Sequence, residues 1–531
     1  MGCFRRLVVP GLLVLAASSS VSADDAERQM SSRVDALLRQ SWKAAGVKAA
    51  PLADDAVFLR RAYLDLTGVI PTVGDVREFL ADKRPDKRSR LIDRLLGTPG
   101  KDGSKRRTGS SRHATHLANA WQHVMLPELN NNIQLRFRAA TFNTWLRNHF
   151  ADNTPYDKIA TDLLTYTGST QTGPGLYYQS LEFKPEELAA STSRIFLGVQ
   201  IQCAQCHKHP FDQWTQEDFW GYAAFFAQIG RPNARTRFLQ AVADTSSGEV
   251  KLPDSQTVVK PKFLTEKETA LSEGVARRQQ AAAWLTSPKN PYFAKAAVNR
   301  AWALLFGYGL VDPVDDFGKH NPSSHPELLN ELAADFVKHG YDLRRLFRVL
   351  AKSRAYQLSS KVTQADSYHP HLFHRMAVKS LTAEQIYDCL DVATAKREPV
   401  TATAYGYPQS NRPSAQKAAF LAKFEAPTQR STEFQAGIPQ ALTMMNGALI
   451  AEATDRDRSD LLIAVAEAPF LTDEQRVETL FLAVLSRRPT AAERARFTGY
   501  VQKSRSSNET RKALSDVTWA LLNSTEFMLN H

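Results

Sequence analysis

The residues with the clearest chemistry stand in one short stretch, CAQCHKHPFD, which runs from position 203 to position 212. Cys203, Cys206 and His207 occupy positions i, i+3 and i+4, so an α-helix would project all three side chains from one face. Covalent attachment of haem needs such a set, because two thiols must reach the vinyl groups while an imidazole binds iron from the same side. The spacing C-x-x-C-H therefore predicts a c-type haem on Cys203, Cys206 and His207.

The same stretch allows other sites. A disulfide between Cys203 and Cys206 is compatible with an oxidising compartment. Cys206, His207, His209 and Asp212 also form a mixed ligand set of the kind that zinc and iron accept. His207 and His209 share a face only on an extended chain, so a metal site predicts an irregular turn, whereas haem predicts a helix through His207. A third alternative is a pair of buried thiols with hydrogen-bonded imidazoles.

Aromatic residues crowd the segment that follows, from Phe211 to Phe226. They could wall a haem, but an aromatic helix face is more often ordinary core. Thr215 and Asp218 have the spacing of a capping box and predict a helix that ends by Gly230. The candidates nearest in sequence for a sixth iron ligand are Met125, His116, His123 and His149.

A second group of acidic and histidine side chains stands in VDDFGKHNPSSHPE. Asp315, Asp316 and Glu327, near His320 and His325, could form a hydrolytic pocket, although loop and helix-cap roles are more typical of such residues. The sequence has no G-x-S-x-G, H-E-x-x-H, Walker loop or dinucleotide fingerprint. No catalytic residue is predicted, and whether the protein is an enzyme stays open.

The first 23 residues read as a secretory signal peptide. Arg5 and Arg6 form its basic region, an apolar stretch follows at 7–17, and Val21-Ser22-Ala23 supplies the small residues before the cleavage point. No later run approaches the roughly 20 apolar residues of a transmembrane helix. The protein is expected to be exported, to the periplasm or the extracellular space, without a transmembrane segment.

Composition narrows the class further. The 531 residues exceed what one core usually holds, roughly 250–300 residues, so two domains are expected. With 43% hydrophobic and 23% charged residues, the chain is neither disordered nor a membrane bundle. Its formal net charge of +12 fits an anionic envelope or acidic glycans, and an exported chain is not expected to meet nucleic acid. Four cysteines are too few for a disulfide-built scaffold.

Helical patterns dominate the chain, which predicts a mainly α fold with two helical domains joined by a small β-containing segment. The first domain is expected at 24–230 and the second at 277–531. Between them, at 231–276, short alternating runs near 239–243, 249–252 and 257–259 are parted by Ser-Gly and Pro-Asp turns and predict a small sheet or ribbon.

Several long motifs resemble a known family. They are DDAVFLRRAYLDLTGVIPT, NTPYDKIATDLLT, KPEELAASTSRIFLGVQIQCAQCHKHPFDQWTQEDFWGYAAFF, NPYFAKAAVNRAWALLFGYGLVDPVDDF and SHPELLNELAADF. They resemble a secreted two-domain family typical of planctomycetes, in which a cytochrome-like domain of unknown function 1549 precedes a domain of unknown function 1553. The final part of the chain, from IPQALTMMNGALI to LLNSTEFMLNH, looks like the end of the second domain.

The resemblance implies export, a mostly helical fold and a haem on Cys203, Cys206 and His207. It also implies a redox partner or an envelope polysaccharide as partner, together with co-exported proteins. Members often carry Asp between the two histidines, where this chain has Lys208, so a metal site that needs a carboxylate there is weakened while Asp212 stays available.

Overall fold

The computed structural model describes residues 23–97, 107–127, 133–230, 241–266, 269–361, 369–395, 415–424, 432 and 438–531. The predicted signal peptide, apart from Ala23, lies outside these residues. α-Helices make up most of the described chain, and its strands are short antiparallel pairs. The predicted mainly α fold is confirmed.

The helices are numbered in the order of the chain. Up to residue 352 they are α1 (Ala23–Ala44), α2 (Asp55–Thr67), α3 (Val73–Ala81), α4 (Lys87–Leu95), α5 (Arg107–Met125), α6 (Ile133–Ala151), α7 (Tyr156–Leu164), α8 (Gly175–Ser180), α9 (Pro185–Thr192), α10 (Gln216–Ala223), α11 (Arg277–Leu285), α12 (Phe293–Phe306), α13 (Pro326–Lys338) and α14 (Leu343–Lys352). Beyond it they are α15 (Ala383–Ala393), α16 (Ala415–Phe424), α17 (Ile438–Asn446), α18 (Ala448–Ala453), α19 (Asp460–Glu467), α20 (Asp473–Leu485), α21 (Ala491–Val501), α22 (Ser507–Leu522) and α23 (Thr525–Met528). A π-helical turn, η2 (Ser193–Leu197), and the 3₁₀ turns η3 (Gln202–Gln205), η4 (Ala224–Phe226), η5 (Ala355–Gln357) and η6 (Pro370–Leu372) complete the helical elements.

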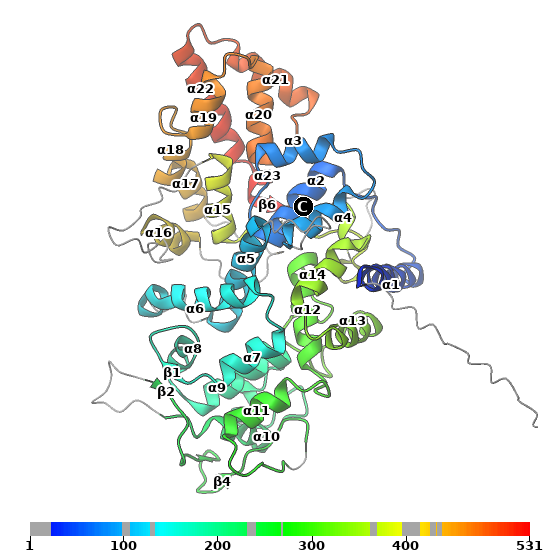
Figure 1. Cartoon of the computed structure of the whole chain (residues 1–531), viewed down its shortest axis with the longest axis vertical. Helices are drawn as coiled ribbons and strands as arrows, with labels where there is room; N and C mark the ends of the chain where they lie inside the picture. Colours follow the sequence, from blue (N-terminus) through cyan, green and yellow to red (C-terminus); the bar gives the residue numbers. More distant parts are fainter. Residues whose placement is uncertain are drawn as a thin grey trace, which may run out of the picture.

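The molecule is elongated, and two groups of helices lie at the two ends of its long axis (Figure 1). Helices α15 to α22 gather at one end, and α7 to α11 gather at the other. Between these groups lie α2, α5, α12 and α14, and the C-terminus returns to the middle beside α2. The first and last parts of the chain therefore meet at the centre of the molecule.

Three two-residue strand pairs support the helices. β1 (Gly168–Ser169) pairs with β2 (Ala241–Val242), β3 (Val250–Lys251) with β4 (Val258–Val259), and β5 (Lys379–Ser380) with β6 (Leu529–Asn530). Strands β2, β3 and β4 fall at the three runs that the sequence predicts, so the β-containing segment is confirmed. Its first strand, however, pairs with β1 of the helical part and not with its neighbours.

Side-chain caps fix where several helices begin. The Asp54 carboxylate accepts the Val57 N–H at 2.9 Å ahead of α2, and Gly68, at φ +73°, ends that helix. The capping box predicted at Thr215 and Asp218 is present at the start of α10. Equivalent boxes open α3, α15, α20 and α21.

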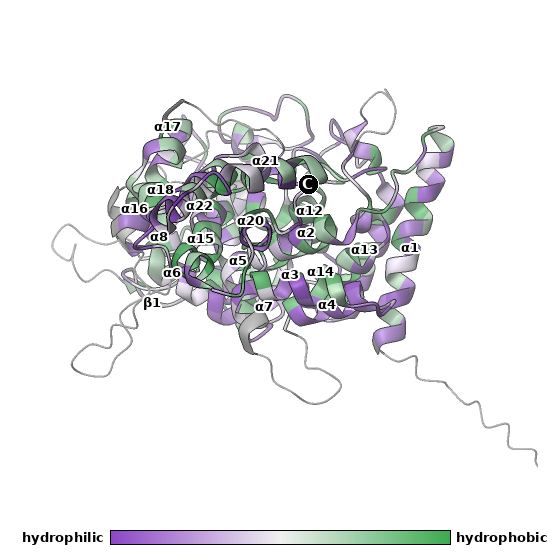
Figure 2. Ribbon diagram, turned by 90° about the horizontal axis from the view of Figure 1, so that it is seen from above, coloured by the Kyte–Doolittle hydropathy of each residue, from purple (hydrophilic) through white to green (hydrophobic). Residues whose placement is uncertain are grey.

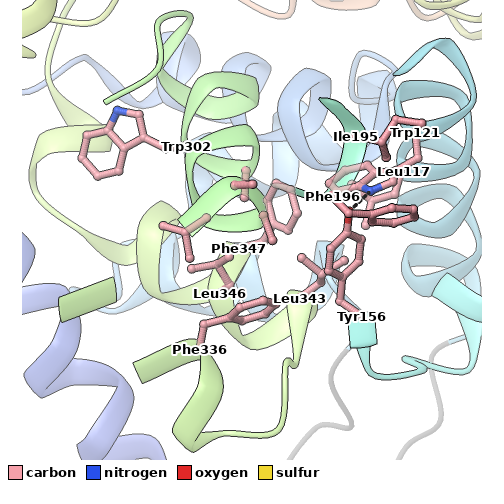
Figure 3. Packing of buried hydrophobic residues seen from close by; sticks show 14 of the residues in the cluster. Leu117, Trp121, Tyr156, Ile195, Phe196, Trp302, Phe336, Leu343, Leu346 and Phe347 are labelled. Atoms are coloured by element: carbon pink, nitrogen blue, oxygen red, sulfur yellow. Dashed lines mark hydrogen bonds between the residues drawn. The ribbon is translucent and has the colours of Figure 1, made fainter. Parts of the chain in front are cut away.

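The larger hydrophobic core collects buried side chains from Val34 to Met376. Near its centre, Tyr156 of α7 stacks on Phe293 of α12 with ring centroids 5.4 Å apart, and Trp121 of α5 meets Tyr156 edge-on at 6.2 Å. Figure 3 shows how these rings and the side chains of α14 fill the space between the helices. Such rings bury large apolar areas, so this core holds the positions of α5, α7 and α12.

A second core takes up the chain from Leu381 to Phe527, together with Leu64 and Ile70 of the first part. Hydrophobic packing thus divides the chain near residue 380. The domain boundaries expected at 230 and 277 both fall inside the larger core, so hydrophobic packing does not mark them.

A buried carboxylate joins the two cores. Asp65 of α2 accepts hydrogen bonds from the Tyr356 hydroxyl at 2.8 Å, the Lys379 ammonium at 2.5 Å and the Asn530 amide at 2.7 Å. Only 4% of the Asp65 side chain and 6% of the Lys379 side chain are exposed. Lys379 and Asn530 lie on the paired strands β5 and β6, so Asp65 connects α2 to the C-terminal strand pair.

Two neighbouring arginines on α2 extend this junction. Arg61 donates to the Tyr356 and Leu358 carbonyls at 2.7 and 2.8 Å, toward the larger core. Arg60 donates to the Val484 and Phe527 carbonyls at 3.0 and 2.9 Å, toward the second. Both side chains are buried, so α2 is the element on which the two cores are assembled.

Seen from above, individual helices carry both hydrophilic and hydrophobic residues (Figure 2). This is the pattern of helices that pack one face on a protein core and turn the other to solvent. In the described part of the chain, none of the helices combines the length and the apolar character that crossing a bilayer requires.

Candidate functional site

The CAQCHKHPFD segment lies between η2 and α10. Gly198, at φ +66°, ends η2, and the chain then forms η3 before it runs in turns and bends from Cys206 to Gln213. The helix through His207 that the haem prediction included is therefore wrong. Pro210 contributes to this, because it lacks the N–H that would bond to the Cys206 carbonyl and disfavours helical geometry at His209, so a helix could not continue past residue 208.

The two thiols lie at and directly after a short 3₁₀ helix. Cys203 is part of η3, and Cys206 directly follows it. Both cysteines are exposed and neither forms a disulfide. The alternative of two buried thiols is wrong.

His207 presents one ring nitrogen to the outside. Its Nδ1 lies 2.7 Å from the Lys208 carbonyl oxygen. A carbonyl can only accept, so Nδ1 carries the proton and Nε2 of the neutral ring carries the lone pair. Histidines that bind metals are commonly fixed in this way, with the second nitrogen donating to a carbonyl or carboxylate.

His209 has the opposite arrangement. Its Nδ1 accepts the backbone N–H groups of Asp212 at 3.0 Å and Phe211 at 3.3 Å. In the neutral ring Nε2 then carries the proton, so His209 offers no lone pair while these bonds persist. Only His207 of the two is prepared to bind a metal or haem iron.

The Asp212 carboxylate is also engaged. Its Oδ1 accepts the Gln213 N–H at 2.7 Å, and its Oδ2 lies only 2.5 Å from the place where a Cβ on Gly318 would stand. Across the residues that the structure describes, no group of three His, Cys, Asp or Glu side chains is arranged to hold a metal ion. The set Cys206, His207, His209 and Asp212 stays a prediction.

Two side chains of α10 donate hydrogen bonds to the backbone of the segment, and neither was predicted from the sequence. The Trp220 indole donates to the Gln205 carbonyl at 3.0 Å, and the Gln216 amide donates to the Cys206 carbonyl at 3.1 Å. A sequence signal for this contact exists: the Thr215–Asp218 capping box predicts a helix that starts eleven residues after η3, and such a helix can fold back against η3. These bonds fix the backbone of the two residues just before His207.

The aromatic residues that follow belong to the protein core. Trp214, Phe219, Tyr222, Phe225 and Phe226 are all buried, so the core interpretation is confirmed for them. Trp220 is half-buried, and Phe211 is exposed over 74% of its surface, with its ring 6.4 Å from that of His320.

The segment rests on a loop of the second half of the chain. The His209 and His320 rings stack with centroids 6.3 Å apart, and His320 Nε2 lies 3.1 Å from Asp316 Oδ1. Gly318 leaves room there, because a Cβ would also stand 2.6 Å from the His320 ring. No sequence pattern links positions more than 100 residues apart, so this contact could not be predicted.

The other residues of the expected hydrolytic pocket separate into different contacts. Asp315 pairs with Arg300, Glu327 pairs with Arg33, and His325 is buried. They do not converge on one pocket with Asp316 and His320.

The proposed sixth ligands lie on α5 and α6 and have other contacts. Met125 is part of the hydrophobic core, and His123 pairs with Glu384 at 3.0 Å. His149 contacts the Thr154 hydroxyl at 3.2 Å, and the His116 ring packs against Gly68. None of the four is held ready as a ligand.

Comparisons with known proteins match two consecutive parts of the chain. Residues 33–231 match PSCyt2, described as a protein of unknown function (DUF1549), and residues 277–418 match PSD1, described as a protein of unknown function (DUF1553). No curated protein and no solved structure gave a match. The chain belongs to the family of two-domain proteins in which a domain of unknown function 1549 is followed by a domain of unknown function 1553.

Proposed function

We propose that the protein is an exported electron carrier that holds one c-type haem through Cys203, Cys206 and His207. The observation that carries this proposal is the presence of two exposed thiols without a disulfide, one within η3 and one directly after it, next to an imidazole with its Nε2 lone pair available. When bound, such a haem supplies a one-electron redox couple.

Each residue of the segment has a distinct task. The Cys203 and Cys206 thiols add to the two vinyl groups, and exposure makes both sulfurs reachable during attachment. The Lys208 carbonyl holds the His207 tautomer and increases the basicity of Nε2. Gln216 and Trp220 fix the backbone from which Cys206 projects.

Export is part of the same proposal. Haem of the c type is attached outside the cytoplasm, and the signal peptide expected at residues 1–23 would bring the chain there. Its electron partner would be another exported protein. The exposed position of the segment supports this, since a partner can approach it directly.

The test is covalent haem content. The full chain is produced with a c-type haem maturation system, and haem staining in a denaturing gel is combined with a pyridine haemochrome spectrum. We expect about one haem per chain, lost in the double variant Cys203→Ala/Cys206→Ala and altered in spectrum in His207→Ala.

Two matched controls separate attachment from folding. Cys389→Ala removes a buried thiol, and Lys208→Ala keeps the backbone carbonyl that His207 needs; both are expected to retain haem. A wild-type chain without covalent haem, or a double-cysteine variant that keeps it, would overturn the proposal.

A second candidate is a zinc or iron site on Cys206, His207, His209 and Asp212, in an envelope protein associated with polysaccharide processing. The turn over residues 206–213 favours it, because such a site requires irregular backbone there. His209 would have to exchange its bonds to the Asp212 and Phe211 N–H groups for the metal. Elemental analysis decides between the two. Stoichiometric metal that is lost in both Cys206→Ser and His209→Ala would support the metal site.

A further inference from the structure

A small recess opens beside the CAQCHKHPFD segment, where its last residues meet the second half of the chain. It has a volume of about 340 Å³ and is bounded by Asp212, the start of α12, the loop at 311–323 and the start of α13. This volume lies at the lower end of the range of small-molecule sites, about 300–1,000 Å³. A ligand of one or two rings is the size that it accommodates.

The recess is built on a fixed loop. The Asn299 amide donates to the Val311 and Val314 carbonyls at 2.8 and 3.1 Å, and its oxygen accepts the Val311 N–H at 3.0 Å. Phe317 donates its backbone N–H to the Gly198 carbonyl at 2.8 Å and packs its ring against Gly198. A site held this firmly needs little ordering when a ligand binds, which favours affinity.

Two lysines at the recess lack acidic partners. Lys295 of α12 and Lys319 of the loop both line it, and in the described part of the chain neither has a carboxylate within 4.0 Å. By contrast, Lys262, Lys352 and Lys379 each pair with an aspartate. The unpaired ammonium groups of Lys295 and Lys319 are available to a negatively charged ligand.

The remaining walls are mixed. Phe317 and Leu329 are buried beneath the opening, and the Tyr292 ring forms part of its side. Four uncharged polar residues also line the recess: Gln213, Asn321, Ser323 and Asn330. The one acidic residue of the lining, Asp212, already accepts the Gln213 N–H. The lining therefore combines two cations with apolar and uncharged polar side chains, a combination that suits a ring with one apolar face, a polar edge and a carboxylate.

We propose that this recess binds a small organic carboxylate with an apolar ring face, through the Lys295 and Lys319 ammonium groups and the Tyr292 and Phe317 rings. Sugar acids and aromatic acids share this chemistry. The site is separate from the haem attachment proposed above and does not require haem. A ligand bound there would lie next to the segment that carries Cys206 and His207.

The test is a titration of the full chain with D-glucuronate, 4-hydroxybenzoate and D-glucose at low ionic strength, followed by saturation-transfer NMR. We expect at least one of the two carboxylates to bind about tenfold more tightly than glucose, because glucose lacks the charge. The tighter carboxylate identifies the source as a sugar acid or an aromatic acid. Equal binding of glucose, or no binding of either carboxylate, would overturn the proposal.

Variants locate the binding. Lys295→Met and Lys319→Met remove the charge while keeping an unbranched side chain, and each is expected to weaken carboxylate binding about tenfold, whereas Lys289→Met, at an exposed position outside the recess, leaves it unchanged. Asp212→Asn removes the negative charge of the lining and is expected to strengthen binding. A Lys289→Met effect as large as that of Lys295→Met would show that binding is nonspecific and refute the site.

The double variant Cys203→Ala/Cys206→Ala separates the two proposals. It is expected to lose haem and to keep carboxylate affinity. If wild-type protein carries no haem but binds the carboxylate, only the haem proposal fails; if it carries haem and binds no carboxylate, only the recess fails.

Discussion

Around α2 the fold closes arginine, lysine and aspartate side chains away from water, whereas along CAQCHKHPFD it leaves cysteine and histidine side chains at the surface. In the first region Asp65 accepts from Tyr356, Lys379 and Asn530, which come from three separate parts of the chain. In the second, Cys203 and Cys206 are exposed, the His207 Nδ1 faces the Lys208 carbonyl, and the Cys206 carbonyl accepts from Gln216 of α10.

The difference in burial between the two regions distinguishes residues that stabilise the fold from residues that are candidates for binding. Buried polar groups cost free energy unless they are paired, so the α2 residues serve the joining of the two cores. Exposed thiols and an exposed imidazole are solvated by water, so they do not have to be paired within the protein and do not serve to hold the fold together. Their outward presentation is what the haem attachment proposed above requires.

The largest effect is expected at Asp65. Asp65→Leu leaves the Lys379 ammonium buried without its carboxylate, so we expect the free energy of unfolding to fall by about 3–5 kcal/mol, measured by urea denaturation. Asp86→Ala, which removes an exposed aspartate paired with Arg90, is the control and is expected to cost under about 1 kcal/mol.

The double variant Asp65→Leu/Lys379→Met sharpens this result. Removing both charges takes away the unpaired buried cation, so part of the lost stability is expected to return. Equal losses in the single and double variants would show that the charge pair is not what holds α2 to the strand pair.

A smaller effect is expected on the pH dependence of the free energy of unfolding. Burial lowers the pKa of His113 to about 3 and that of His325 to about 4, so both stay neutral in the folded protein well below the pKa of 6.5 that they have when unfolded. The unfolded chain therefore takes up protons that the folded chain does not. Stability is expected to fall as the pH drops below 6.5, by about 1.4 kcal/mol per pH unit for each histidine, until the folded pKa is reached.

His113→Asn tests this assignment. Asparagine can keep the donor that His113 Nδ1 offers to the Leu66 carbonyl at 2.7 Å, but it does not titrate. Between pH 6.5 and pH 5 the variant is expected to lose about 2 kcal/mol less than the wild type in urea denaturation. Identical slopes would mean that His113 is not a source of the acid sensitivity; the cost of the substitution itself is read at pH 7.5.

Local sequence signals predicted much of the framework. The Thr215–Asp218 capping box, the three β runs and the mainly α fold follow from neighbouring residues, and the structure confirms them. The same holds for the aromatic core of α10. Such features depend on bonds that close within a few positions, which is why the sequence reveals them.

The predictions from sequence were wrong or incomplete where the structure depends on contacts between distant residues, or where two local preferences compete. The spacing of Cys203, Cys206 and His207 predicted a helix, whereas the structure has only a 3₁₀ turn ahead of Pro210, a residue that disfavours helical geometry at the position before it. The contact of His209 with His320 joins parts of the chain with no shared pattern. The roles of Asp65 and Lys379 were equally hidden, since their partner residues lie hundreds of positions apart.

The smallest expected effect gives the sharpest comparison between the two regions. Cys203→Ser and Cys206→Ser each change an exposed side chain, so the free energy of unfolding is expected to shift by less than about 0.5 kcal/mol. Cys389→Ser places a hydroxyl in the second core and is expected to cost about 1–3 kcal/mol.

In protein made without haem attachment, maleimide is expected to label Cys203 and Cys206 at once. Cys389, where burial raises the thiol pKa to about 12, should react only after unfolding in urea. Peptide mapping by mass spectrometry distinguishes the three sites. Protection of Cys203 and Cys206 in the folded chain would contradict the surface placement on which the haem proposal depends, because a thiol that a small maleimide cannot reach would not be open to a macrocycle either.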